Sequence, residues 1–401
     1  MTEIEAAVSA LGPGPLQEQK LRRHIDPLFS RVLQQRGKRI YLANHSLGRP
    51  LDRMAADVAE GLSYWYCGLG EAWKQWLAEM ALFRARVASL IRAPGPQCIV
   101  PKASAGQGLR AVLNCYTGPL RIVATRSEFS SIDFILKAYA HCGRISVNWV
   151  RPRQGPFYRA DDFADALHAG ADLLVVSLVF FDTGQLLTGA GAIISMAKEQ
   201  GVRVLVDFYH AAGTLPVDVE ALNVDFAIGG GYKYLRCGPG AAWLYVHPGH
   251  LEGLRTLDTG WFAAPRPFAF ARPENPQFAR GADGWLESTP AVLPFYQARA
   301  GLEFTLAMGV ERLRAYSLAQ QAALTAGLAK ERIVPLGASE PRGAFLVIGT
   351  PKAEAAAARL AEEGVTVDAR EGLLRICPDI LNTPEELAEA AERIGNVLHK
   401  L

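Results

Sequence analysis

Short apolar runs alternate with helix-like stretches along the chain from about residue 97 onward. The apolar runs occupy residues 99–101, 121–125, 144–150, 172–180, 202–208, 225–230 and 241–246. Helical patterns stand between most of them, at residues 105–116, 129–142, 161–168 and 188–200. Nearly continuous apolar strands separated by helices indicate a mainly parallel sheet that is covered on both faces. The sequence therefore predicts an α/β fold, and such sheets bind ligands beyond the carboxyl ends of their strands.

The remaining segments predict a second, smaller domain, as expected for a chain of 401 residues. Helical patterns also cover residues 15–38, 51–92 (with apolar faces from Trp65, Trp73, Trp76 and Phe83) and 291–331. Residues 255–290 predict loops, and the chain ends as strand 344–349, helix 352–363, strands 365–368 and 373–376, and helix 384–399. We expect an N-terminal segment (1–50) that packs with the small domain or a partner subunit, a large domain (51–295) and a small C-terminal α+β domain (296–401).

Charge and composition exclude several functional classes. The formal charge of +2 gives no electrostatic reason to expect nucleic acid or membrane binding. The start, MTEIEAAVSALGPGPL, lacks a basic signal-peptide region, and no apolar run reaches the roughly 18 residues of a membrane span. Six cysteines are scattered without a CxxC pair, and the HPGH motif at His247 and His250 is interrupted by Pro-Gly. We expect a cytoplasmic protein with reduced thiols and no metal site.

The stretch GGGYKYLRCGPGAAWLYV at residues 229–246 frames one lysine in an unusual way. Lys233 lies between Tyr232 and Tyr234, after three glycines and before a Gly-Pro-Gly turn. Glycines remove side chains where the backbone passes close to a ligand. A surface lysine in a flexible loop is the alternative when this stretch is read alone.

Three other polar segments follow or precede predicted strand ends. SAGQG at residues 104–108 opens a helix whose N–H groups, with the Ser104 hydroxyl, suit an anion. SEFSSIDF at 127–134 offers Phe129 for stacking on a planar ring, although a core phenylalanine also fits. Asp207 closes the most apolar strand, where a buried carboxylate needs a partner unless it caps a helix.

Together these segments suit pyridoxal phosphate. That cofactor needs a lysine for covalent attachment, an anion beside its pyridine nitrogen, a phosphate cradle and a flat neighbour for its ring. Lys233, Asp207, Ser104 with its helix end, and Phe129 supply these groups in turn. Neither a Walker A pattern nor a GxGxxG after a strand competes with this interpretation.

The chain resembles the kynureninase family within the class V aminotransferase group of fold-type I pyridoxal-phosphate enzymes. The resemblance rests on SLVFFDTGQ, VDFYHAAG, VDFAIGGGYKYLRCGPG and GWF, and it extends from NHSLG to LLRICP, which is most of the chain. It implies the fold-type I architecture, a homodimer with active sites shared between subunits, and a small-molecule amino-acid substrate.

The resemblance also implies a role for each matched position. Lys233 would attach the cofactor, Asp207 would pair with its pyridine nitrogen, and Tyr232 would contact its phosphate and act with them in catalysis. The remaining cofactor contacts would be Ala103, Ser104, Phe129, Ser177, His210, Thr289 and, from the other subunit, Trp261. Arg375 would grip the substrate α-carboxylate, a bidentate task that suits a guanidinium, and His45, Ser46 and Asp182 would surround the substrate.

This chain departs from the family pattern around the substrate side chain rather than around the cofactor. Ile132 stands where the family has a second aspartate near the ring, with Asp133 one residue later. Asp182 replaces an aromatic residue, Thr289 an asparagine, and His45 alters an asparagine-serine pair. Ala-Ala follows GWF where animal members have a histidine.

The leading hypothesis is hydrolysis of the Cβ–Cγ bond of a β-acyl amino acid such as kynurenine, which gives alanine and an aromatic acid such as anthranilate. The alternative within the cofactor class is a cysteine desulfurase, β-lyase or aminotransferase. A desulfurase needs a reactive thiol, for which Cys377 and Cys237 are the candidates, although Cys377 also fits a core position and Cys237 lies in a tight loop close to Lys233. An inactive cofactor-binding protein or a nucleotide-binding α/β protein represents a different class.

Overall fold

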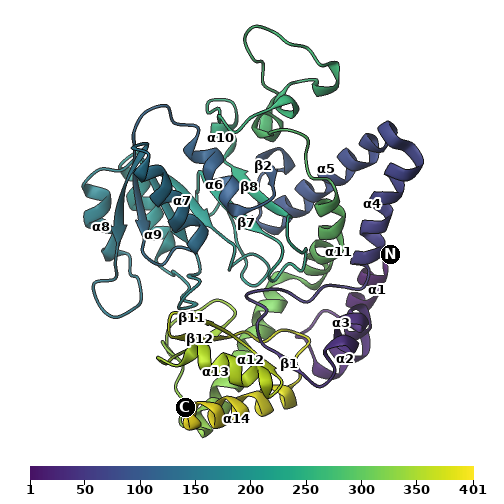
Figure 1. Cartoon of the computed structure of the whole chain (residues 1–401), viewed down its shortest axis with the longest axis vertical. Helices are drawn as coiled ribbons and strands as arrows, with labels where there is room; N and C mark the ends of the chain where they lie inside the picture. Colours follow the sequence, from purple (N-terminus) through teal and green to yellow (C-terminus); the bar gives the residue numbers. More distant parts are fainter.

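The computed structural model describes all 401 residues, and its central element is a seven-stranded sheet (Figure 1). The strand order is β2-β8-β7-β6-β5-β3-β4. Neighbours from β7 to β4 pair in parallel, whereas β8 is antiparallel to both β7 and β2. The mainly parallel seven-stranded sheet predicted from the apolar runs is therefore confirmed. The strands are β2 (Ile99–Lys102), β3 (Leu120–Thr125), β4 (Ile145–Val150), β5 (Leu173–Ser177), β6 (Arg203–Asp207), β7 (Phe226–Gly230) and β8 (Ala242–Val246).

Helices cover both faces of this sheet. The connections that enter β3 and β4 run in one direction along the sheet, and those that enter β5 and β6 run in the other. Because parallel crossovers are right-handed, α6 and α7 lie on one face and α8 and α9 on the opposite face. Each residue of β5, β7 and β8 is buried, which explains why their sequences are continuous apolar runs. These helices are α6 (Ala105–Leu113), α7 (Ser130–His141), α8 (Asp161–His168) and α9 (Ala190–Glu199).

A smaller antiparallel sheet lies near the C-terminus, with the order β11-β12-β9. A second apolar core fills the space between this sheet and its helices, and it includes Leu324, Leu360 and Ile394. Strand β1 (Ile40–Tyr41) pairs in parallel with β10 (Val365–Thr366), so residues near 40 join the C-terminal unit. The domain limits stay a prediction. The other elements here are β9 (Leu346–Gly349), β11 (Asp368–Arg370), β12 (Leu373–Ile376), α12 (Val310–Lys330), α13 (Ala353–Glu362) and α14 (Pro384–Lys400).

Three segments expected to be continuous helices are interrupted. Residues 15–38 contain two short helices because the 3-10 turn at Asp26–Phe29 separates them. Within residues 51–92, Leu69 has a φ of 44°, and within residues 291–331, Gly309 has a φ of 79°. Both values lie outside the right-handed helical region and end a helix. The helices are α1 (Glu3–Ser9), α2 (Glu18–His24), α3 (Ser30–Arg36), α4 (Met54–Gly68), α5 (Ala72–Leu90), α10 (Pro248–Leu251) and α11 (Leu293–Met308). Trp76 and Phe83 are buried as predicted, whereas Trp65 is 56% exposed.

The segment between α10 and α11 is largely loop, as predicted. It contains only short 3-10 helices at Trp261–Ala263, Pro267–Ala269 and Gly281–Trp285. Figure 1 shows part of it projecting from the top of the molecule as a long green loop. Phe268 and Phe270 remain exposed on this projection. None of the helices combines the length and hydrophobicity that a membrane span requires.

Candidate active site

Lys233 is the buried centre of the candidate site. It follows β7 and is only 4% exposed, and its Nζ atom lies 2.7 Å from Nε2 of His210. Burial lowers the pKa of the Lys233 ammonium most strongly, and Arg375 lowers it further while Asp207 opposes the change. The fold therefore favours the neutral amine, which is the form able to accept a proton or attack a carbonyl.

Asp207 is the last residue of β6 and lies beside Lys233 at the carboxyl edge of the sheet. Its Oδ1 atom accepts a hydrogen bond from the Tyr209 N–H at 2.6 Å, and Oδ2 accepts none. Burial raises the pKa of the Asp207 carboxyl, against the lowering effects of the Tyr209 N–H and the Lys233 charge. The free Oδ2 atom is available to a cationic donor from a ligand.

Two buried histidines flank the lysine. His210 contacts the Tyr234 hydroxyl through Nδ1 at 3.2 Å, on the side opposite Lys233. His45 stacks on Phe345 with ring centroids 4.8 Å apart, and neither of its ring nitrogens has a hydrogen-bond partner. Burial lowers the pKa of both imidazoles, and the Lys233 and Arg375 charges lower it further. Both rings are therefore neutral at physiological pH.

A cavity of about 530 Å³ opens beside the lysine. Its wall includes five residues predicted from the sequence, namely Ser104, Phe129, Asp207, Tyr232 and Lys233. The Phe129 ring centroid lies 5.2 Å from Lys233 Nζ, so an aromatic face borders the amine. Ser104 caps α6, where its hydroxyl accepts the Gln107 N–H at 3.2 Å. The cavity therefore offers a positive helix end, an aromatic face, a carboxylate and an amine.

The three glycines before Lys233 make room for protein side chains. A Cβ atom on Gly229 would lie 2.3 Å from the Trp243 ring, and one on Gly230 would lie 2.1 Å from the Tyr209 hydroxyl. A Cβ atom on Gly231 would lie 2.4 Å from Cβ of Cys237. The neighbours that exclude larger residues at these positions belong to the chain itself. The expected close approach of this backbone to the cofactor stays a prediction.

Arg375 lies on β12 and is already paired with a carboxylate. Its Nη2 atom donates to Oδ2 of Asp368 at 2.6 Å, and its Nη1 atom donates to the Phe181 carbonyl at 2.5 Å. Asp368 lies opposite Arg375 in the β11–β12 register and also accepts the Ser46 hydroxyl. His45 Nε2 is 3.6 Å from the same carboxylate. Asp368 is thus an unpredicted member of the group around Arg375, and only the strand pairing reveals it.

Other predicted residues take positions outside the Lys233 cavity of this chain. Trp261 donates its indole N–H to the Thr289 hydroxyl at 3.3 Å, and Thr289 lines a neighbouring cavity of about 200 Å³ together with Ala103. The Ala103 N–H is bonded to the Gln107 side chain at 2.7 Å. Asp182 accepts the Thr183 N–H at 2.6 Å within its own turn. The proposed cofactor and substrate roles of these four residues stay predictions.

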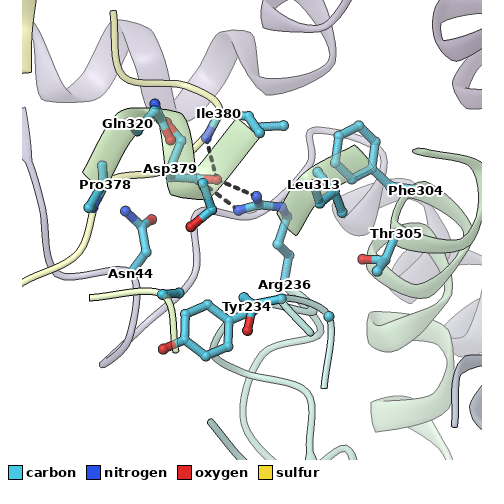
Figure 2. Close-up of a pocket in the computed structure, with 14 residues that line it drawn as sticks. Asn44, Tyr234, Arg236, Phe304, Thr305, Leu313, Gln320, Pro378, Asp379 and Ile380 are labelled. Atoms are coloured by element: carbon cyan, nitrogen blue, oxygen red, sulfur yellow. Dashed lines mark hydrogen bonds and ion pairs between the residues drawn. The ribbon is translucent and has the colours of Figure 1, made fainter. Parts of the chain in front are cut away.

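A buried ion pair joins the lysine loop to the C-terminal unit (Figure 2). Arg236 donates from Nη1 and Nη2 to both oxygens of Asp379, at 2.9 and 2.6 Å, and Arg49 approaches the same carboxylate at 3.3 Å. Burial alone would raise the pKa of Asp379, but Arg236 and Arg49 hold it lowered to about 2. Because Arg236 follows Lys233 by three residues and Asp379 follows Arg375 by four, this pair helps to fix the lysine relative to Arg375.

Neither candidate cysteine has the environment of a reactive thiol. Cys377 is buried beside the Ala344 carbonyl, and Cys237 contacts the Leu235 and Ala298 carbonyls. Burial raises the pKa of both thiols, so the nucleophilic thiolate is disfavoured. Cys377 occupies the core position that the sequence offered as its alternative, and Cys237 is buried as well.

Comparisons with known proteins identify sequences that are similar to this chain. The family model described as aminotransferase class-V matches residues 63–382. The chain is 27% identical over 361 residues to the uncharacterized aminotransferase YcbU of Bacillus subtilis, covering 88% of this chain and 93% of that protein. It is 29% identical over 363 residues to a kynureninase of Deinococcus radiodurans, covering 86% of this chain and 84% of that protein.

Solved structures support the same fold. The cystine C–S lyase C-DES, in complex with cysteine persulfide, superimposes with a TM-score of 0.81 at 20% identity, covering 90% of this chain and 99% of that one. The cysteine desulfurase CsdA of Escherichia coli gives a TM-score of 0.79 at 19% identity, covering 97% of this chain and all of that one. At these identities the likeness establishes the architecture only.

Proposed function

The chain belongs to the aminotransferase class-V family and is a pyridoxal-phosphate enzyme of the fold-type I architecture, and on this premise we propose that it hydrolyses the Cβ–Cγ bond of a β-acyl amino acid. Kynurenine is the proposed model substrate, with alanine and anthranilate as products. The observation that carries the proposal is that three groups lie near one another: Lys233, whose burial favours the neutral amine, Asp207, and Arg375, whose guanidinium can bind a carboxylate. The near full-length likeness to a kynureninase supports this substrate class.

The residues around the cavity fit the cofactor. Lys233 would attach it, and the unbonded Oδ2 atom of Asp207 would accept its pyridine N–H. Phe129 offers a ring face, while Ser104 and Tyr232 border the space available to its phosphate. When bound, pyridoxal phosphate supplies an electron sink that stabilises negative charge on the substrate α-carbon.

The protein groups divide the remaining work. Lys233 would remove the α-proton, because burial lowers its pKa and keeps a fraction of the amine neutral at physiological pH. The Asp207 carboxylate would stabilise the resulting ammonium. Burial raises the pKa of Tyr232, so its hydroxyl keeps its proton and would serve as a proton donor on the cavity wall. Arg375 would hold the substrate carboxylate and so fix the α-carbon relative to Lys233.

We also propose that the working unit is a homodimer with shared active sites. Trp261 and Thr289 lie together outside the Lys233 cavity of their own chain, near the projecting loop that carries exposed Phe268 and Phe270. A second copy that received this loop would complete the site. Light scattering of the purified protein should therefore give the mass of two chains, and a monomer that turns over substrate at full rate would contradict the proposal.

A substrate panel tests the proposed reaction. Purified protein loaded with pyridoxal phosphate should release alanine and an aromatic acid from kynurenine or 3-hydroxykynurenine. Release of sulfide and alanine from cysteine would instead indicate a desulfurase, and keto-acid formation would indicate an aminotransferase. The buried, high-pKa environments of Cys377 and Cys237 weigh against the desulfurase. Absence of alanine release from both kynurenines would overturn the proposed substrate class.

Arg375→Leu is expected to raise KM for the amino-acid substrate by roughly 10- to 100-fold, because the substrate carboxylate would lose a charge-assisted hydrogen bond. Arg370→Leu is the matched control, because Arg370 lies on the adjacent strand and near Asp368 but is exposed. Steady-state kinetics with a circular dichroism check of folding would measure both variants. An unchanged KM in the Arg375 variant would remove this residue from the substrate site.

A further inference from the structure

Glu128 is a buried carboxyl group next to the cofactor cavity. It is only 2% exposed, and it precedes Phe129, whose ring borders the cavity. Its Oε1 atom lies 2.6 Å from Oγ1 of Thr125 and 3.3 Å from the Ser177 nitrogen, and its Oε2 atom lies 2.6 Å from Oγ of Ser177. Thr125 and Ser177 are the last residues of β3 and β5. One carboxyl group therefore ties together the carboxyl ends of two neighbouring strands.

Glu128 shares this strand edge with Asp207. Ser177 and Asp207 are register partners on the adjacent parallel strands β5 and β6. Two ionised carboxylates in one dry volume would repel each other, and no arginine or lysine is bonded to Glu128. Burial raises the pKa of Glu128 to about 7, and the Asp207 charge raises it as well, against the lowering effects of the Ser177 and Thr125 hydrogen bonds.

We propose that Glu128 is a positioning residue that works as an uncharged acid, holding Ser177 and the Phe129 loop against the cofactor ring while Asp207 alone carries the negative charge. The contacts suit this state, because a hydroxyl can accept as well as donate a hydrogen bond. In the structure the Ser177 N–H and the Thr125 hydroxyl donate to Oε1, and the Ser177 hydroxyl donates to Oε2. Protonation of Oε2 would reverse only this last bond, because the Ser177 hydroxyl can turn to accept it. The Ser177 hydroxyl hydrogen is then free to be directed toward its neighbour Asp207.

The other titratable groups near Glu128 are few. Asp207 faces it from β6, and Lys233 lies beyond Asp207 on the loop after β7. Tyr158 approaches from the segment before α8, where its hydroxyl lies 3.5 Å from Ser127 Oγ. None of these groups is a cation bonded to the Glu128 carboxyl, so no direct ion pair stabilises its ionised form.

Glu128→Gln tests the protonation state, since glutamine resembles the neutral acid in shape. We expect cofactor affinity within roughly threefold of wild type at pH 6, measured by equilibrium titration with pyridoxal phosphate. Glu128→Ala is expected to weaken binding by about tenfold, because it leaves the Ser177 and Thr125 groups unpaired. Ser177→Ala should weaken it in the same direction.

The apoprotein provides a readout independent of catalysis. Infrared difference spectra of wild type minus Glu128→Gln should show the carbonyl band of a protonated carboxylic acid at pH 6, which disappears as pH rises through about 7. The Glu128 pKa is raised in the fold above its ordinary value of 4.5. Its contribution to stability is therefore complete below pH 4.5 and is lost as pH rises through about 7. The thermal midpoint of wild type relative to the glutamine variant should fall over this interval.

Glu79→Gln is the matched control. Glu79 is equally buried but bonds Arg86 and Arg299 as a carboxylate, so its glutamine variant should be destabilised at pH 6. The proposal is overturned if Glu128→Gln lacks the infrared difference, or if it loses cofactor affinity as severely as Glu128→Ala. The inference rests on the cofactor and not on the proposed substrate, so failure of the kynurenine panel would leave it standing.

Discussion

Replacing Lys233 with alanine is expected to lower turnover by roughly 10²–10⁴-fold or more, whichever amino acid proves to be the substrate. Lys233 is the only lysine that lines the cavity, and its neutral amine is favoured by burial. No neighbouring group replaces it, because the pKa of the adjacent His210 lies well below its ordinary value and its imidazole is therefore a weak base. Single-turnover kinetics on the loaded variant would measure the loss.

A spectroscopic signature separates this role from a general loss of structure. Wild-type protein with cofactor should show visible absorption that borohydride removes, whereas Lys233→Ala should keep the folded circular dichroism spectrum and lose covalent attachment. Lys137→Ala is the control, because Lys137 is exposed on α7 and pairs only with Asp133. Turnover by the Lys233 variant at the wild-type rate would refute the central role of this residue.

Replacing Asp379 with alanine is expected to cost about 3–5 kcal/mol of the free energy of unfolding. The substitution leaves the Arg49 and Arg236 guanidinium groups buried without their shared anion. Four N–H groups that now donate to the carboxylate would lose their acceptor, namely two from Arg236, one from Arg49 and the backbone N–H of Ile380. Chemical denaturation followed by circular dichroism would measure the change.

The position of this ion pair adds an effect on the active site. The pair connects the loop of Lys233 to the strand end after Arg375, so its loss should also raise KM for the substrate. Asp165→Ala is the control, because Asp165 pairs with Arg153 on the surface and is largely exposed. The double variant Arg236→Met/Asp379→Leu should recover part of the lost stability, since it removes two of the three buried charges and leaves only Arg49 without the anion. An unaltered denaturation midpoint in Asp379→Ala would contradict the structural role.

Much of the fold was predictable because its signals are local. Strands β5, β7 and β8 are buried at each residue, so they appear in the sequence as apolar runs whose limits agree with the structure to within a few residues. Strand β4 is exposed at Ser146 and Asn148, but it still has an apolar alternate face. The interrupted helices were not predictable from periodicity, because the hydrophobic pattern continues across a single residue with positive φ, such as Leu69 or Gly309. Strand β1 was missed because its two residues depend on pairing with β10.

The sequence by itself determined the cofactor chemistry, because Lys233, Asp207 and Phe129 each follow a recognisable strand, and parallel strands end at one edge. Only the tertiary structure decided which ion pairs and hydrogen bonds form around the site. The contacts Arg236–Asp379, Arg375–Asp368 and Ser177–Glu128 join residues that are separate in the sequence. Burial and the charges brought together by folding set the pKa values of these groups, and neither is encoded in any one segment.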